Sequence, residues 1–215
     1  MKIKITLHIN GIDREIEVPT HATLLSTLRG LGFHGVKFGD EQGLSGADTV
    51  LLDGKPVNAG SLLAAQAEGH KIATIEALGE HPEQGWKHTD GLHPLQKAFV
   101  MTGAIQCGYC TPAQILAAYA LLKKNPNPSE AEVRAAISGV LCRCTGYLKP
   151  VQAVLQAAAV MRGEETSQQR SVKWEFGNVA PEKKTWQTVG KPEIKVDAVK
   201  LVQGKPAFAA DIEKR

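Results

Sequence analysis

Apolar and polar positions alternate along the first 80 residues in a way that is typical of β-strands. Residues 3–9 carry Ile, Ile, Leu and Ile at every second position, which predicts a half-buried strand. Asn10-Gly11 follows and favours a tight hairpin, so residues 14–18 are expected to return antiparallel. A short helical pattern comes next, and then two further β-rich runs, at 49–52 and 72–75. Strands crossed by one helix predict a small α+β unit of the ubiquitin-like kind over residues 1–80.

From Leu92 onward the apolar positions recur at helical spacing. Thr111 is expected to cap the second of four short helices, and Ser129 with Glu132 has the spacing of a capping box for the third. Tight connections between four short helices predict a small all-α bundle over residues 88–162.

Residues 163–215 show no clear hydrophobic period and predict an extended C-terminal tail that lies on something else. The chain carries a net charge of +3, and residues 171–215 hold nine Lys and Arg against six Asp and Glu. The excess is therefore mild and sits in the tail, which does not indicate nucleic-acid binding. The first ten residues do not resemble a signal peptide, and no stretch reaches the ~18 apolar residues of a membrane span. We expect a soluble cytoplasmic protein.

All four cysteines of the chain lie within residues 107–144. Cys107 and Cys110 precede a predicted helix, whereas Cys142 and Cys144 follow another. Two such helix ends can meet in a bundle, where backbone N–H groups favour thiolates. The spacing leaves three interpretations open. They are a [2Fe–2S] cluster, a structural zinc site, disfavoured by the C-x-C pair and the long gap, and disulfides, which are rare in the cytosol.

The residues around the cysteines form two motifs, Gln106-Cys107-Gly108-Tyr109-Cys110-Thr111-Pro112 and Cys142-Arg143-Cys144-Thr145-Gly146-Tyr147. Both motifs resemble the signatures of the helical iron–sulfur domain in the molybdenum hydroxylases, the family of xanthine dehydrogenase and aldehyde oxidoreductase. The resemblance implies that all four cysteines bind one [2Fe–2S] cluster. It also implies that Gln106 and Cys144 lie close to the molybdopterin of a catalytic partner chain.

A second resemblance concerns the first 80 residues, which are similar to the plant-ferredoxin-like (β-grasp) domain of the same family. That domain binds another [2Fe–2S] cluster through C-x4-C-x2-C and a more distant Cys. The surrounding frame of glycines and apolar residues is present here, but the four ligand positions hold Asp40, Ser45, Asp48 and Gly60. Iron–sulfur centres prefer thiolate ligands, so we expect this domain to be folded, metal-free, and open and polar at the loop.

The tail adds a third resemblance, because residues 189–212 are similar to the opening stretch of the family's molybdenum-binding subunit. Taken together, the resemblances imply an electron-transfer subunit or domain that accepts electrons from a molybdopterin-binding catalytic subunit. The partner would hydroxylate a purine, an aldehyde or an N-heterocycle, and a flavin (FAD) subunit or another acceptor would receive the electrons. The alternatives are a structural zinc-binding interaction module and a redox-inactive scaffold subunit.

Overall fold

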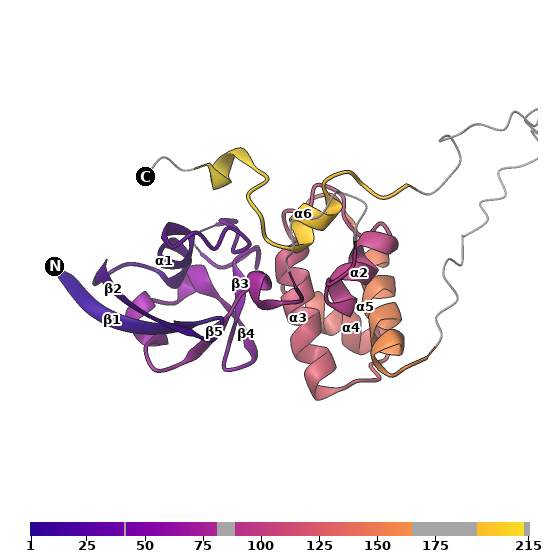
Figure 1. Cartoon of the computed structure of the whole chain (residues 1–215), viewed down its shortest axis with the longest axis horizontal. Helices are drawn as coiled ribbons and strands as arrows, with labels where there is room; N and C mark the ends of the chain where they lie inside the picture. Colours follow the sequence, from indigo (N-terminus) through magenta and orange to yellow (C-terminus); the bar gives the residue numbers. More distant parts are fainter. Residues whose placement is uncertain (41, 81–88, 165–192, 213–215) are drawn as a thin grey trace, which may run out of the picture.

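The computed structural model describes residues 1–40, 42–80, 89–164 and 193–212. They form a sheet lobe (1–80) beside a helical lobe (89–164), and the C-terminal segment (193–212) runs across both (Figure 1). The expected α+β class is confirmed. The strands are β1 (Lys2–Ile9), β2 (Ile12–Pro19), β3 (Thr49–Leu52), β4 (Lys55–Asn58) and β5 (Lys71–Ala73). The α-helices are α1 (Leu24–Gly30), α2 (Pro94–Met101), α3 (Thr111–Lys124), α4 (Glu130–Ile137), α5 (Leu148–Met161) and α6 (Ala198–Val202). The 3₁₀ turns are η1 (Ala59–Ser61), η2 (Ala64–Ala67), η3 (Ile75–Ala77) and η4 (Ala209–Asp211).

The sheet lobe contains a mixed sheet with the strand order β2-β1-β5-β3-β4. β1 and β5 are parallel, and the other neighbours are antiparallel. The predicted hairpin joins β1 to β2, and Asn10 and Gly11 have φ angles of 52° and 84°, the left-handed values that a tight hairpin favours. The alternation of β1 buries Ile5, Leu7 and Ile9 against three buried leucines of α1.

The helical lobe consists of α2 to α5, at the positions where helical spacing predicted four helices. The predicted capping box is present: the amide of Ser129 donates to the Glu132 carboxylate at 2.8 Å, and the Glu132 amide donates to the Ser129 hydroxyl at 3.3 Å. The expectation for α3 was wrong by one residue, because Cys110 rather than Thr111 occupies the N-cap position. None of the helices in the described part of the chain is long and apolar enough to cross a bilayer.

The two lobes share buried apolar contacts. Leu51 of β3 and Ile75 of η3 belong to the same buried cluster as the core residues of the helical lobe. The sheet lobe has a second cluster of its own, beneath α1. Burial of shared apolar surface is the main favourable term in such packing, so it fixes the cysteine-bearing loops relative to the sheet lobe.

The C-terminal segment differs from the expected extended tail. It contains α6, whose apolar residues Ala198, Val199, Leu201 and Val202 are all buried in the cluster that the two lobes share. The side-chain amide of Gln96 in α2 also donates to the Val202 carbonyl at 2.8 Å. α6 is therefore part of the chain's own core, because a five-residue helix with an apolar face packs against α2 and α3.

Parts of the tail lie outside the described residues. These parts include Trp174, Phe176, Trp186 and residues 189–192, the beginning of the stretch that resembles the molybdenum-binding subunit. Phe208, in the described part of the tail, is partly buried against the chain's own core.

Candidate iron–sulfur site

The four cysteines lie on two loops that meet. Cys107 and Cys110 are on the loop between α2 and α3, and Cys142 and Cys144 are on the loop between α4 and α5. All four thiols are free. The thiol of Cys107 is in hydrogen-bond contact with that of Cys144, and Cys110 makes the same contact with Cys142. Cys144 also contacts Cys142 within its own loop, so the four thiols form one connected group.

Backbone amides point at the sulfur atoms of this site. The Tyr109 amide lies 3.5 Å from the Sγ of Cys107, and the Gly146 amide lies 3.4 Å from the Sγ of Cys142. Both loops turn back sharply: Gly108 has φ +86° and Thr145 has φ +59°, an unusual value for a β-branched residue. Donors aimed at sulfur stabilise thiolates and tune the potential of an iron–sulfur cluster.

Burial and the neighbouring thiols shift the pKa values of these cysteines in different directions. Burial raises the pKa of Cys110, and the neighbouring thiols of Cys142 and Cys107 raise it further. Burial and the neighbouring Cys144 also raise the pKa of Cys107, whereas hydrogen bonds from Cys107 lower the pKa of Cys144. Metal ligands must be deprotonated, and four adjacent thiolates require positive charge among them. The donor set therefore suits a cationic centre bound by thiolates.

The grouping of these ligands bears on the kind of metal centre. Within the described residues, no three His, Cys, Asp or Glu side chains are placed to hold a single metal ion. A structural zinc site needs four ligands around one ion, whereas each iron of a [2Fe–2S] cluster takes two protein thiolates. A [2Fe–2S] cluster takes four thiolates in all from its protein, and the four thiols here form one connected group.

Two tyrosines contribute to the site and were not assigned a role from the sequence. The hydroxyl of Tyr147 accepts a hydrogen bond from the Cys142 amide at 2.8 Å. The hydroxyl of Tyr109 donates to the carbonyl of Phe38 in the sheet lobe at 2.5 Å. The available signal was the presence of one tyrosine in each cysteine motif.

Gln106, which was expected near a partner's molybdopterin, is exposed and lies beside the second cysteine loop. A Cβ atom added to Gly146 would stand 3.3 Å from the side-chain nitrogen of Gln106. The structure therefore brings Gln106 next to the loop that carries Cys144.

The four positions without cysteine in the sheet lobe also lie close together, joined by hydrogen bonds. The Asp40 carboxylate accepts from the amides of Gln42, Leu44 and Ser45 at 2.7–2.9 Å. The Asp48 carboxylate is buried and accepts from the Gly60 amide at 2.5 Å. The expectation of an open polar loop is thus wrong for Asp48, because its carboxylate faces inward to the backbone of η1.

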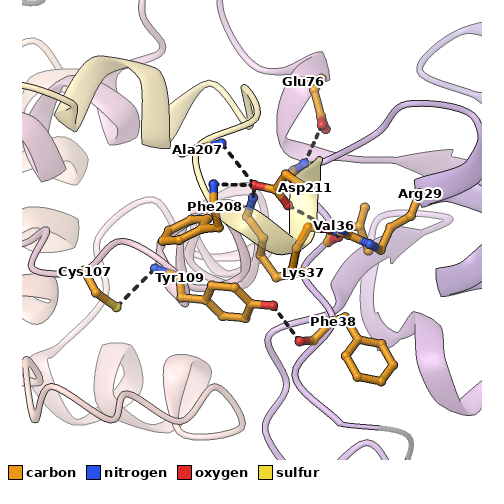
Figure 2. Close-up of polar contacts among 12 residues, drawn as sticks. Arg29, Val36, Lys37, Phe38, Glu76, Cys107, Tyr109, Ala207, Phe208 and Asp211 are labelled. Carbon is orange, nitrogen blue, oxygen red and sulfur yellow. Dashed lines mark hydrogen bonds and ion pairs between the residues drawn. The ribbon is translucent and has the colours of Figure 1, made fainter. Parts of the chain in front are cut away.

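The C-terminal segment is anchored beside this region by a buried ion pair (Figure 2). The carboxylate of Asp211 lies 2.7 Å from the Lys37 ammonium and 3.3 Å from the Arg29 guanidinium, and all three side chains are at most 4% exposed. Burial lowers the pKa of Lys37. Burial alone would raise the pKa of Asp211, but hydrogen bonds and the Lys37 charge hold it below its ordinary value. The rings of Tyr109 and Phe208 meet edge to face at 5.0 Å, so the first cysteine loop also contacts this segment.

Comparison with known proteins places this geometry in context. The model of a [2Fe–2S] binding domain matches residues 74–155. The nicotinate dehydrogenase small FeS subunit of Eubacterium barkeri is 44% identical over 157 residues, which are 73% of this chain and 95% of that subunit.

Two solved structures resemble the fold. The aldehyde oxidoreductase of Desulfovibrio desulfuricans matches with a TM-score of 0.79 and 37% identity, over 97% of this chain and 22% of that chain. One chain of the quinoline 2-oxidoreductase of Pseudomonas putida matches this protein with a TM-score of 0.67 and 40% identity. The match covers 76% of this chain and 99% of that chain. The chain thus spans nearly all of the small-subunit relative, but about a fifth of the aldehyde oxidoreductase chain.

Proposed function

The chain belongs to the iron–sulfur subunits and domains of the molybdenum hydroxylases, and on this basis we propose that its four cysteines together hold one [2Fe–2S] cluster. The cluster, when bound, carries single electrons. The observation that supports this ligand set most directly is that thiols of the two loops contact one another, Cys107 with Cys144 and Cys110 with Cys142.

The protein supplies the surroundings of these thiolates. The amides of Tyr109 and Gly146 stabilise negative charge on sulfur, and the N-terminus of α3 begins directly after Cys110. Tyr147 fixes the amide of Cys142. These contacts keep the ligands in place without large rearrangement when the charge of the site changes.

The redox partner is a molybdopterin-binding catalytic subunit that hydroxylates a purine, an aldehyde or an N-heterocycle. The printed names of the relatives, a nicotinate dehydrogenase, an aldehyde oxidoreductase and a quinoline oxidoreductase, favour the last two classes. Gln106 and Cys144 face that subunit's cofactor, since Gln106 is exposed beside the second cysteine loop. Electrons then pass to a flavin subunit or to another acceptor.

We also propose a domain organisation, which the family membership supports. We assign residues 1–80 to a ferredoxin-like β-grasp domain without cluster ligands and residues 88–162 to the helical [2Fe–2S]-binding domain. We assign residues 163–215 to a linker and the start of a segment that resembles the molybdenum-binding subunit.

Iron and sulfide analysis after anaerobic purification tests the ligand set. We expect about two irons and two sulfides per chain, visible charge-transfer absorption, and a single kind of electron paramagnetic resonance signal after reduction. Cys144→Ala should lose the iron, whereas Ser138→Ala, an exposed hydroxyl at the end of α4, should keep it. A colourless protein with one zinc, or full iron content in Cys144→Ala, would contradict the proposal.

A further inference from the structure

The loop around Ser45, which has no cysteine at the ferredoxin-like ligand positions, contacts the loop that carries Cys142 and Cys144. The amide of Leu141, directly before Cys142, donates to the carbonyl of Ser45 at 2.8 Å. One residue further on, Gly46 approaches so closely that an added Cβ would overlap the carbonyl oxygen of Gly139. The loop of residues 40–48 is thus a direct neighbour of the second cysteine loop and can influence its position.

Asp40 holds the first half of the 40–48 loop. Its carboxylate accepts hydrogen bonds from three backbone amides, including that of Ser45 at 2.7 Å, and from the Ser45 hydroxyl. These contacts keep the pKa of Asp40 far below its ordinary value, the Ser45 hydroxyl first among them, so the group stays charged near neutral pH. Hydrogen bonds to a charged acceptor are roughly twice as strong as neutral ones. The position of the Ser45 carbonyl therefore depends on Asp40.

Asp48 holds the second half. It is 1% exposed, and its side chain accepts the Gly60 amide while its carbonyl accepts the Ala59 amide at 3.3 Å. A side chain at position 60 would meet this carboxylate, because an added Cβ would lie 2.9 Å from the Asp48 Oδ2. The carboxylate of Asp48 thus occupies the space that a side chain at position 60 would need.

We propose that Asp40 is a positioning residue for the remaining metal site, while Asp48 fixes the far end of the same loop. They hold the 40–48 loop by hydrogen bonds where a related protein would use cluster ligands. Through Ser45, this loop fixes the Leu141 amide and so the backbone that carries Cys142. This role rests on the proposed function, because it matters most when Cys142 binds iron. Hydrogen bonding and solvent exposure around a cluster set its potential, so a looser loop should change the potential without removing the cluster.

The test compares Asp40→Asn with Asp13→Asn in the full chain. Asp13 is a matched control, since its exposed carboxylate lies in the same lobe and pairs with His8 at 2.6 Å on β1. We expect amide hydrogen exchange over residues 139–142 to become about tenfold faster in Asp40→Asn and to stay unchanged in the control. Two irons should remain, with the midpoint potential shifted upward because water reaches the thiolates more easily.

A second variant keeps the proposal falsifiable if Asp40→Asn does not fold. Ser45→Ala removes only the hydroxyl that faces Asp40, and we expect a smaller shift of exchange and potential in the same direction. Unchanged exchange over 139–142 together with an unchanged potential in a folded variant would overturn the positioning role. If the unaltered chain contains no iron, the proposed function fails, whereas the exchange comparison in the iron-free chain still decides whether Asp40 holds the Leu141 contact.

Discussion

Removal of the Asp211 carboxylate should release the end of the chain without unfolding the molecule. The carboxylate is fully buried and accepts the amides of Ala207 and Phe208 at 3.1 Å, besides its contacts with Lys37 and Arg29. In Asp211→Ala the Lys37 ammonium, with its side chain 2% exposed, remains buried without its carboxylate. A charge left in this way is the costly outcome of breaking a buried ion pair.

The free energies of the ion pair at Asp211 and of the burial of α6 determine which part of the segment is released. Breaking a buried pair by removing one partner costs about 3–5 kcal/mol. Val199, Leu201 and Val202 of α6 are at most 4% exposed, and burial of each contributes roughly 1.5–3 kcal/mol, or about 4.5–9 kcal/mol for the three. Most of the range for the loss at Asp211 therefore lies below the range for the burial that holds α6. We expect η4 to detach from the sheet lobe while α6 stays in the core.

Hydrogen exchange measures this prediction directly. In Asp211→Ala, exchange over residues 205–212 should accelerate strongly, exchange over α6 should change little, and the free energy of unfolding should fall by about 3–5 kcal/mol. Asp197→Asn is the control, since it breaks a half-exposed pair with Lys195 in the same segment and should cost at most about 1 kcal/mol. A loss below about 1 kcal/mol in Asp211→Ala, or equal acceleration in α6 and η4, would refute the reasoning.

Two further predictions concern the same segment. The pKa of Asp211 is depressed despite burial, so its contribution to stability is complete above its ordinary pKa and is lost as the pH falls through the lowered one. Protease resistance of residues 205–212 should therefore persist from pH 7 to about pH 4 and disappear in stronger acid; an Asp211→Asn variant that shows the same acid transition would contradict this assignment. Gly204 and Gly163 have φ +75° and +80°, but an added Cβ at Gly204 would lie 2.6 Å from Ile75, whereas Gly163 has open space. Thermal unfolding should show Gly204→Ala to be less stable than Gly163→Ala by roughly 1–3 kcal/mol, and equal stability would mean that the segment does not pack as described.

Local pattern determined much of the fold. The alternation in β1, the Asn10-Gly11 turn and the capping box at Ser129 act over a few residues, and each appears where the sequence predicts it. Motifs are local as well, so the two cysteine motifs could be identified without a structure. The absence of cysteine at the four ferredoxin-like positions could be identified in the same way. Family membership and the presence of a [2Fe–2S] domain followed from them and agree with the comparisons.

Long-range packing decided the rest. Lysine side chains usually lie at the protein surface. Lys37 is nevertheless 1% exposed, because Asp211, 174 positions away, supplies a buried countercharge. The pairing of thiols across the two loops likewise depends on how α3 and α4 pack. Hydrophobic periodicity reports which face of an element is apolar, but not which distant surface covers it. For that reason the sequence by itself indicated most of the elements and the resemblance to a [2Fe–2S] domain. It did not predict β4 or α6, and the docking of the C-terminal segment and the hydrogen-bonded loop at Asp40 and Asp48 were decided by tertiary contacts alone.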